Sequence, residues 1–403
     1  MHIAHFTNTY KPNINGVVRS VSTFRNTLTQ MGHNVFIFSQ DTQEYEDEEA
    51  FVFRYPSLSI PTVDYSFSIP VSPFIDWLLP SLKLDIIHSN HPVLLGYAAA
   101  DKAEKFNIPL VFTFHTRYEE YSHYIPFSQA FVKEIIVDWL LRYMERCQHI
   151  VTPSESIRQM LIKYSGLHDH ITTIPTGIEL KPFHEATGAS IRHKLNWGKE
   201  QIIVSIGRLA AEKNWKTLIA ACALAMQSNQ NIRLILIGDG PQKEELKKYA
   251  KELGVTDKVV FTGLVPFDQI PKYLKAADLF CFASVTETQG LVTMEAMAAG
   301  LPVAAVEGTG TSEIVQDGKT GLLTENSSES LARAINRILS EPDLYERFKA
   351  VALEQSQTFD ISYQAQRMIS VYEQAIEDKR AGRSIKNDLE ILRRSKNQLV
   401  FIE

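Results

Sequence analysis

The residues best suited to chemistry stand in one short stretch, Thr286-Glu287-Thr288-Gln289-Gly290-Leu291, and Glu295 follows eight positions after the first glutamate. Glu287 is expected in a loop that leaves a strand, where a carboxylate can hydrogen-bond the hydroxyls of a sugar. Gly290 is expected to open a helix and to let its backbone N–H groups approach an anion. Glu295 would lie just inside that helix, where it can bind both hydroxyls of a ribose. Glutamates also occur on solvated helix faces, but the glycine and the Ala-Met-Ala-Ala-Gly that follows favour a binding site.

A second set of residues, Gly207-Arg208-Leu209 with Lys213, follows a predicted strand. An arginine and a lysine at the end of a strand can clamp a diphosphate, because both are cations and a guanidinium can bind two oxygens at once. The alternative is a surface lysine beside an arginine that pairs with a carboxylate, which is common among exposed cations. Only the combination with the glutamate motif favours the clamp.

Two further candidates lie in the first half of the chain. Gly16, directly after Asn15, would let a phosphate or a substrate approach backbone N–H groups, although any such turn can carry a glycine. His115 ends a predicted strand, although a lone histidine is more often structural. The polar aromatic residues that follow it would suit an acceptor pocket, and they are Tyr118, Tyr121 and His123.

The stretch Gly238-Asp239-Gly240-Pro241 is a weak phosphate-binding pattern. It lacks the third glycine of a dinucleotide fingerprint, so we interpret it as a strand-to-helix turn with Pro241 at the first helical position. No Asp-x-Asp triplet is present, so a divalent ion has no evident carboxylate ligands. The positive charge opposite a diphosphate would then come from Arg208, Lys213 and helix N-termini.

The elements that must position these residues are short apolar runs alternating with helical patterns, which is typical of parallel sheets covered by helices. The predicted strands of the first half are 2–8, 35–38, 51–55, 85–89, 110–114, 149–152 and 172–175. Those of the second half are 202–206, 232–237, 259–262, 279–282 and 303–306. The predicted fold class is α/β, with two doubly wound Rossmann-like domains facing a cleft. Such sheets bind ligands at the carboxyl ends of their strands.

The predicted domain boundary is Ile174-Pro175-Thr176-Gly177 followed by Pro182, because turn formers end the first pattern there. The first domain would span residues 1–180 and the second residues 181–358. Residues 359–403 would form a C-terminal helix followed by a basic tail. Between 379 and 396 this tail holds seven Lys and Arg residues and two acidic ones.

Chain length, net charge, cysteine content and apolar runs limit the classes of protein to which this chain can belong. A chain of 403 residues exceeds what one core usually supports, so two domains are expected. The net charge of −6 argues against nucleic acid as a partner. Three widely spaced cysteines predict a reducing compartment and no disulfide framework. No apolar run is long enough to span a membrane, so a cytoplasmic location is expected, free or on the inner membrane face.

In this order along the chain, the motifs resemble glycosyltransferase family 4, whose members are retaining enzymes with the GT-B fold. The resemblance covers nearly the whole chain and includes the loop at Gly16, His115, Ile174–Gly177, Arg208 with Lys213, Gly238–Pro241 and the Glu287-to-Glu295 motif. It implies transfer of a sugar from a nucleotide diphosphate to an acceptor hydroxyl without a metal ion or cofactor. The first domain would bind the acceptor and the second the nucleotide sugar, and the C-terminal helix of residues 359–403 would return to the first domain.

The resemblance also implies roles for single residues. Arg208 and Lys213 would hold the diphosphate, Glu287 would contact the donor sugar, and the stretch around Val265 would border the base. The implied catalytic residues are His115, Arg208, Lys213 and Glu287. The implied donor-binding residues are Gly16, Gly207, Arg208, Lys213, Val265, Glu287, Thr288, Gln289, Gly290, Leu291 and Glu295. The implied acceptor-binding residues are Tyr10, Asn15, His115, Tyr118, Tyr121 and His123.

One departure from the family pattern indicates a particular branch of the family. The usual Pro-Phe-Gly after the first glutamate is Thr288-Gln289-Gly290 here, and with the 115–124 stretch this is similar to the branch that contains diacylglycerol α-glucosyltransferases. That branch implies UDP-glucose as donor and diacylglycerol as acceptor. The alternatives are a transferase for a soluble sugar, inositol phosphate or small-metabolite acceptor, and a catalytically silent sugar-nucleotide-binding scaffold.

For a retaining reaction, front-face substitution is favoured over double displacement, because no motif supplies an evident carboxylate nucleophile. A lipid acceptor would also require contact with a membrane. The apolar helix 131–143 and the basic tail are the two candidates for that contact. An ordinary core helix and a solvated terminal helix are the respective alternatives.

Overall fold

The computed structural model describes residues 1–13, 15–42, 45–59, 66–116, 129–287 and 289–389. The chain divides into two compact units. Unit 1 consists of Met1–Gly177 together with Ile361–Glu403, and unit 2 is Ile178–Asp360. Unit 2 is therefore a continuous insertion between two segments of unit 1.

Unit 1 is built on a seven-stranded parallel sheet in the order β3-β2-β1-β6-β7-β8-β9. The strands are β1 (His2–Thr7), β2 (Asn34–Gln40), β3 (Val52–Tyr55), β6 (Ile86–Ser89), β7 (Leu110–Thr113), β8 (His149–Thr152) and β9 (Ile171–Thr173). The chain adds strands on one side of β1 and then on the other, so the strand order reverses between β1 and β6. The ends of these two strands are where such sheets bind ligands. A small antiparallel pair, β4 (Ser57–Ser59) and β5 (Ser66–Ser68), lies outside this sheet.

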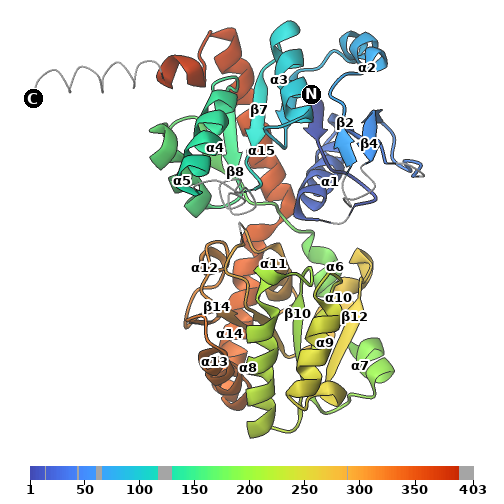
Figure 1. Cartoon of the computed structure of the whole chain (residues 1–403), viewed down its shortest axis with the longest axis vertical. Coiled ribbons are helices and arrows are strands. Elements are labelled where there is room, and N and C mark those ends of the chain that lie inside the picture. Colours follow the sequence, from blue (N-terminus) through green and yellow to red (C-terminus); the bar gives the residue numbers. More distant parts are fainter. Residues whose placement is uncertain (14, 43–44, 60–65, 117–128, 288, 390–403) are drawn as a thin grey trace, which may run out of the picture. The chain divides into compact units, whose positions relative to one another are not determined.

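Helices bury both faces of the unit 1 sheet. They are α1 (Gly16–Gln30), α2 (Pro73–Leu78), α3 (Leu95–Lys105), α4 (Gln129–Met144), α5 (Glu155–Ser165) and α15 (Ile361–Arg380). The C-terminal helix α15 packs against α1, and Met368 and Tyr372 join the same hydrophobic core as Ile3 and Val111 of the sheet (Figure 1). The predicted return of the last helix to the first domain is thus present in the structure.

Unit 2 is built on a six-stranded parallel sheet in the order β12-β11-β10-β13-β14-β15. The strands are β10 (Gln201–Ile206), β11 (Ile232–Ile237), β12 (Val259–Gly263), β13 (Leu279–Phe282), β14 (Val303–Val306) and β15 (Gly321–Thr324). Here the strand order reverses between β10 and β13. The carboxyl ends of these two strands lead into the arginine–lysine segment and the glutamate motif.

The helices of unit 2 also cover both sheet faces (Figure 1). They are α6 (Leu180–Glu185), α7 (Ala189–Leu195), α8 (Trp215–Ser228), α9 (Lys243–Glu252), α10 (Ile270–Ala276), α11 (Leu291–Ala298), α12 (Thr311–Ile314), α13 (Ser328–Ser340) and α14 (Pro342–Ser356). In β13, Leu279 and Cys281 face one core while Phe280 and Phe282 face the other. Because side chains on both faces of the sheet are buried, consecutive residues of each strand are apolar in the sequence.

The predicted fold class is confirmed for both units, each of which is a doubly wound parallel sheet. One local prediction was wrong. Pro241 is not the first residue of a helix, because α9 begins at Lys243 after a turn. The backbone of Gln242 instead donates to the carbonyl of Leu209 at 2.9 Å, which draws these residues into a turn.

Helix α4, one of the two candidates for membrane contact, contributes to the core of unit 1. Leu140, Tyr143 and Met144 are buried there. Arg142 pairs with Asp138, and Arg146 pairs with Asp101 and Glu104 of α3. This part of α4 is therefore an ordinary core helix, which was the alternative to membrane contact. None of the described helices is both long enough and apolar enough to cross a membrane.

Candidate active site

The loop after β10 carries the predicted cationic clamp of unit 2. Arg208 is the second residue after the strand, and Lys213 ends a short 3-10 turn (Ala211–Lys213) before α8. Trp215, the first residue of α8, is 2% exposed and its Nε1 donates to the carbonyl of Arg208 at 2.8 Å. Asn214 adopts a left-handed backbone conformation with a φ of 55°, and its Nδ2 donates to the carbonyl of Ala283. The loop is therefore anchored both to its own helix and to the end of β13.

Lys213 and Glu287 meet at this end of the sheet. Their Nζ and Oε1 atoms form an ion pair, and the two side chains are 22% and 18% exposed. The side chain of Arg208 is exposed and forms no ion pair within the described part of the chain. Of these three charged residues, the structure thus brings Lys213 and Glu287 into contact and leaves Arg208 exposed to solvent.

The start of α11 lies beside this pair. Gly290 caps the helix with a φ of 80°, a conformation that favours glycine, and Leu291 is its first residue. The backbone carbonyl of Glu287 accepts from the N–H of Gly310 at 2.8 Å, which fixes the preceding loop. Gln289 is buried, and its Nε2 contacts the sulfur of Met294. Glu295 is 1% exposed inside the first turns of α11, deeper than Glu287.

The turn Gly238-Asp239-Gly240 supports the cationic segment from behind. Leu209 donates its N–H to the carbonyl of Asp239 at 2.9 Å. A Cβ atom on Gly238 would lie 1.9 Å from the carbonyl oxygen of Gly207, and one on Gly240 would lie 2.5 Å from that of Leu209. The glycines are therefore required by close backbone packing against Gly207–Leu209, and this explains a pattern that looks like a phosphate cradle.

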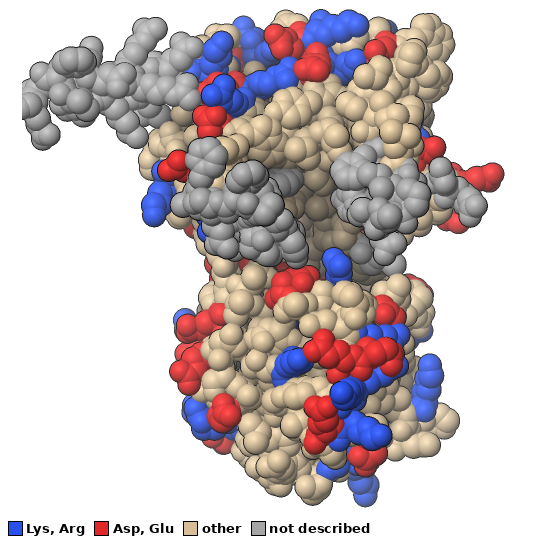
Figure 2. Space-filling view, viewed as in Figure 1, with Lys and Arg blue, Asp and Glu red and all other residues tan. Residues whose placement is uncertain are grey.

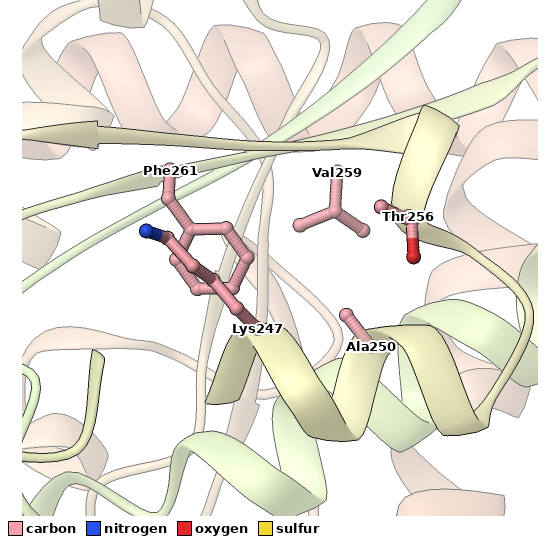
Figure 3. Close-up of a pocket in the computed structure, with 5 residues that line it drawn as sticks. All are labelled: Lys247, Ala250, Thr256, Val259 and Phe261. Atoms are coloured by element: carbon pink, nitrogen blue, oxygen red, sulfur yellow. The ribbon is translucent and has the colours of Figure 1, made fainter. Parts of the chain in front are cut away.

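The predicted base-binding stretch follows β12. Val265 is half-buried against the core, while Leu264 and Phe267 on either side of it are 64% and 51% exposed. A separate pocket of about 260 Å³ lies between α9 and β12, lined by Lys247, Ala250, Thr256, Val259 and Phe261 (Figure 3). Val259 begins β12, so this pocket is not at the carboxyl ends of the strands where the predicted site residues lie.

Positive and negative side chains alternate over α8 and α9 of unit 2 (Figure 2). Lys216 pairs with Glu245 at 2.6 Å, and Lys247 pairs with Glu244 at 2.7 Å. This face therefore carries balanced charge, in contrast to the exposed guanidinium of Arg208.

In unit 1, the loop after β1 places the first predicted glycine at a helix start. Asn15 caps α1, since its Oδ1 accepts from the N–H of Val18 at 3.0 Å, and Gly16 is the exposed first residue of the helix. Among the described residues, no atom lies within 4 Å of a Cβ built on Gly16. Tyr10 is 0% exposed and donates to Glu49 at 2.6 Å. This bond ties Tyr10 to Glu49 within unit 1, and its acceptor-binding role stays a prediction.

His115 follows β7 and joins a cluster of histidines at the ends of β1, β6 and β7. Its Nε2 lies 3.0 Å from Oδ1 of Asn90. Burial, with smaller contributions from His91 and His5, lowers the pKa of His115 to about 3. Burial likewise lowers the pKa of His5 to about 3 and that of His91 to about 4. These imidazoles are therefore neutral at physiological pH.

Four predicted site residues lie outside the described residues, namely Tyr118, Tyr121, His123 and Thr288. Two residues that the sequence reasoning did not select also hold the sites together. Asn214 was detectable as an asparagine after Lys213, since asparagine tolerates left-handed backbone better than most residues. Asn90 stands directly after a predicted strand, which is a position that favours functional residues in parallel sheets.

The buried histidines predict a loss of stability in mild acid. His5, His88 and His91 all have pKa values lowered by burial from 6.5. The unfolded chain therefore binds protons below about pH 6.5 that the folded chain does not. The stabilisation is complete above that pH and falls by about 1.4 kcal/mol per histidine for each pH unit toward pH 4. Urea unfolding midpoints measured from pH 8 to pH 5 should decrease steeply below pH 6.5.

A His88→Gln variant is the informative comparison for this pH dependence. It removes one buried titrating group, so its midpoint should decrease less between pH 6.5 and pH 5 than that of the wild type. His184→Gln, which replaces a residue of helix α6 outside the cluster, should behave as the wild type. Equal midpoints at pH 8 and pH 5 in the wild-type protein would contradict the buried, neutral state of the cluster.

Two doubly wound parallel sheets, with an arginine, a lysine and a glutamate at the reversal point of the second, define a protein of the GT-B class. The sequence model of "Glycosyltransferase Family 4" matches residues 14–181, and that of "Glycosyl transferases group 1" matches residues 189–355. The chain is 32% identical over 357 residues to an alpha-monoglucosyldiacylglycerol synthase of Streptococcus pneumoniae, covering 86% of this chain and 80% of the relative. The chain belongs to glycosyltransferase family 4.

A second relative agrees with this membership, and solved structures share the fold. An alpha-monoglucosyldiacylglycerol synthase of Acholeplasma laidlawii is 30% identical over 85% of this chain and 89% of its own length. The fold resembles a sucrose-phosphate synthase from Thermosynechococcus elongatus, with a TM-score of 0.78, 24% identity, and coverage of 92% and 98%. It also resembles Anabaena HepE in complex with UDP and glucose, with a TM-score of 0.73, 22% identity, and coverage of 92% and 99%.

Proposed function

We propose that this chain transfers glucose from UDP-glucose to the free hydroxyl of diacylglycerol, with retention of configuration and without a metal ion. The observation that carries the proposal is the group formed by Arg208, Lys213, Glu287 and the start of α11 at one end of the unit 2 sheet. Cations and a helix N-terminus are suited to a diphosphate, and a carboxylate beside them is suited to sugar hydroxyls.

In this proposal, Arg208 and Lys213 stabilise the charge that develops on the leaving diphosphate. Arg208 is exposed and available for a phosphate oxygen, and Lys213 is held at the site by Glu287. Two cations and the N–H groups at Gly290 supply the positive potential that a divalent ion supplies in other enzymes. Glu295 would bind the ribose, and the exposed apolar residues around Val265 would cover the base.

Front-face substitution accounts for retention in this site. The carboxylate of Glu287 pairs with Lys213, which lowers its capacity to act as a nucleophile. In front-face attack, the acceptor oxygen forms the new bond on the side that the diphosphate leaves, and a phosphate oxygen takes the acceptor's proton. The protein then needs to orient both substrates and to stabilise the separating charges.

The acceptor is proposed from similarity to the two alpha-monoglucosyldiacylglycerol synthases, which cover most of the chain. Diacylglycerol lies in a bilayer, so the proposal includes work at the cytoplasmic membrane surface. A soluble acceptor is the second candidate, because a D-inositol 3-phosphate glycosyltransferase of Nocardia farcinica is 28% identical over 72% of this chain and 67% of its own length.

The test is transfer by purified protein in mixed micelles of diacylglycerol and detergent, with UDP-glucose, UDP-galactose or GDP-mannose as donor and EDTA present throughout. We expect a monoglucosyl lipid from UDP-glucose, with an α-anomeric proton signal by NMR. UDP release without glycolipid would overturn the acceptor, and a β-linked product would overturn retention. Activity that disappears with EDTA and returns with a divalent ion would overturn metal independence. No UDP release with any donor would favour the binding scaffold.

A further inference from the structure

A buried hydrogen-bond network lies at the carboxyl ends of β1, β6 and β7 in unit 1. Its centre is Asn90, which is 2% exposed. The backbone N–H of Asn90 donates to the carbonyl of Phe6 at 2.9 Å, and the side-chain Nδ2 lies 3.3 Å from the same carbonyl. The side-chain Oδ1 lies 3.0 Å from Nε2 of His115. One amide therefore joins a fixed backbone acceptor to His115, which the family resemblance implies to be catalytic.

The carbonyl of Phe6 determines which way this amide points. A carbonyl oxygen can only accept a hydrogen bond, so the atom of Asn90 that faces it must be the NH₂ group. The reverse orientation would place two acceptor oxygens 3.3 Å apart in a buried site, with no hydrogen between them. The oxygen of the amide consequently faces His115, and Nε2 of His115 must carry the proton that this oxygen accepts.

We propose that Asn90 is a positioning residue that holds His115 in the tautomer protonated on Nε2, so that Nδ1 is the atom His115 offers to a substrate hydroxyl. This inference rests on the proposed function and on the catalytic role that the family resemblance implies for His115. A lone pair on Nδ1 accepts a hydrogen bond from an alcohol and repels a phosphate oxygen. The group recognised by His115 is therefore a hydroxyl and not the diphosphate.

The remaining contacts of the network agree with a single direction of hydrogen bonding. Nδ2 of Asn90 donates to Nδ1 of His5 at 3.3 Å, so the proton of His5 is on Nε2, which lies 3.5 Å from the hydroxyl of Tyr372. That hydroxyl donates to Nδ1 of His88 at 2.7 Å. Nε2 of His88 then donates to the hydroxyl of Thr113 at 2.6 Å. Each of these bonds from Asn90 to Thr113 then has one donor and one acceptor.

Because the imidazole of His115 is neutral, its tautomer determines which ring nitrogen can accept a hydrogen bond. Because burial lowers the pKa of His115 to about 3, the imidazole has one proton to place over the whole working pH range. An imidazolium would donate from both nitrogens and would need no partner to select one of them. A neutral ring can accept from a hydroxyl at Nδ1 only when Nε2 holds the proton, and Asn90 provides the acceptor for it.

The first test needs no substrate and is therefore independent of the proposed activity. In protein labelled with ¹⁵N-histidine, long-range ¹H–¹⁵N correlation spectra distinguish a protonated from an unprotonated ring nitrogen. The His115 signals are assigned by their absence in His115→Gln. We expect Nε2 protonated and Nδ1 unprotonated in the full-length wild-type protein from pH 6 to pH 8. A proton on Nδ1 of His115 would overturn the proposal.

Two variants of Asn90 test whether the amide is the cause. Asn90→Leu removes the acceptor, so a measurable fraction of His115 should carry its proton on Nδ1. Asn90→Asp places a carboxylate beside Nε2, so His115 should become doubly protonated at a higher pH than in the wild type. Thr113→Val changes only the far end of the network and should leave the His115 tautomer unchanged. An unchanged tautomer in Asn90→Leu would overturn the proposal, and the wild-type spectrum decides it if both Asn90 variants fail to fold.

Kinetics then separate positioning from a merely structural role. Asn90→Leu should lower kcat about tenfold or more while the KM for the nucleotide sugar changes little. In a His115→Gln background, which has no tautomers, the same substitution should have no further effect on kcat. An equal loss in both backgrounds would show that Asn90 acts through the fold. If no transfer activity is found in the wild-type protein, the proposed function fails while the spectra still decide the tautomer.

Discussion

The Arg208→Ala variant should turn over its substrates about a hundredfold more slowly than the wild-type protein, or slower still. Losing one contact to a developing anion in a dry site raises the barrier by about 3–4 kcal/mol, and each 1.4 kcal/mol is about a factor of ten in rate. The folded protein should be as stable as the wild type, because the guanidinium is exposed and no ion pair within the described residues is lost. Steady-state kinetics and thermal unfolding, measured side by side, check the two halves of this prediction.

Lys213→Ala should give a similar loss of turnover together with a loss of stability. Removing Lys213 leaves the carboxylate of Glu287, 18% exposed, without its cation. A Lys213→Ala/Glu287→Gln double variant should recover stability without recovering turnover. Lys216→Ala is the matched control, because Lys216 pairs on the surface with Glu245 in the same region. Near-normal turnover in both Arg208→Ala and Lys213→Ala would exclude the clamp.

Gly238→Ala should destabilise unit 2 and disable the site together. Gly238 has a φ of 141°, and the added methyl would lie 1.9 Å from the carbonyl oxygen of Gly207. The backbone before Arg208 must therefore move, at a cost of about 3 kcal/mol or more. The indole of Trp215 donates to the Arg208 carbonyl, so its fluorescence should report the displacement. Urea unfolding followed by fluorescence and calorimetric titration with UDP provide the measurements.

Gly254→Ala is the control for this experiment, because it separates the cost of a left-handed backbone from the cost of a steric clash. Gly254 also has a left-handed backbone, with a φ of 71°, but no atom of the described part of the chain lies within 4 Å of its added Cβ. It should therefore lose only the left-handed preference, about 1–2 kcal/mol, and bind UDP as the wild type does. If Gly238→Ala is no less stable than Gly254→Ala, the close packing of the two turns is not what holds the cationic segment.

The regular elements were predictable because parallel strands buried on both faces read as continuous apolar runs. The predicted strands 149–152, 232–237, 279–282 and 303–306 coincide with β8, β11, β13 and β14. Strand β15 was missed because it begins with a glycine. Gly321 stands there since a Cβ would lie 2.0 Å from the carbonyl oxygen of Val303. That requirement comes from a strand eighteen residues earlier and leaves no periodic pattern in the sequence.

The residues of the candidate site could be predicted from the sequence, but the contacts between them could not. Arg208, Lys213 and Glu287 could be selected because each follows a predicted strand. The ion pair between Lys213 and Glu287 joins residues 74 positions apart, and the bond from Tyr372 to His88 joins residues 284 positions apart. Such contacts depend on which strands are neighbours, so the anchoring role of Asn214 and the orientation of Asn90 required the three-dimensional structure.

The insertion of unit 2 within unit 1 has a consequence for synthesis on the ribosome. One face of the unit 1 sheet is covered by α15, whose residues Met368 and Tyr372 emerge after the whole of unit 2. Unit 2 is continuous in sequence, so all of its strands are available before unit 1 can close its core. The half of the molecule encoded first is thus the half completed last. A nascent chain that stops before Ile361 would present an apolar sheet face to chaperones beside an already complete second unit.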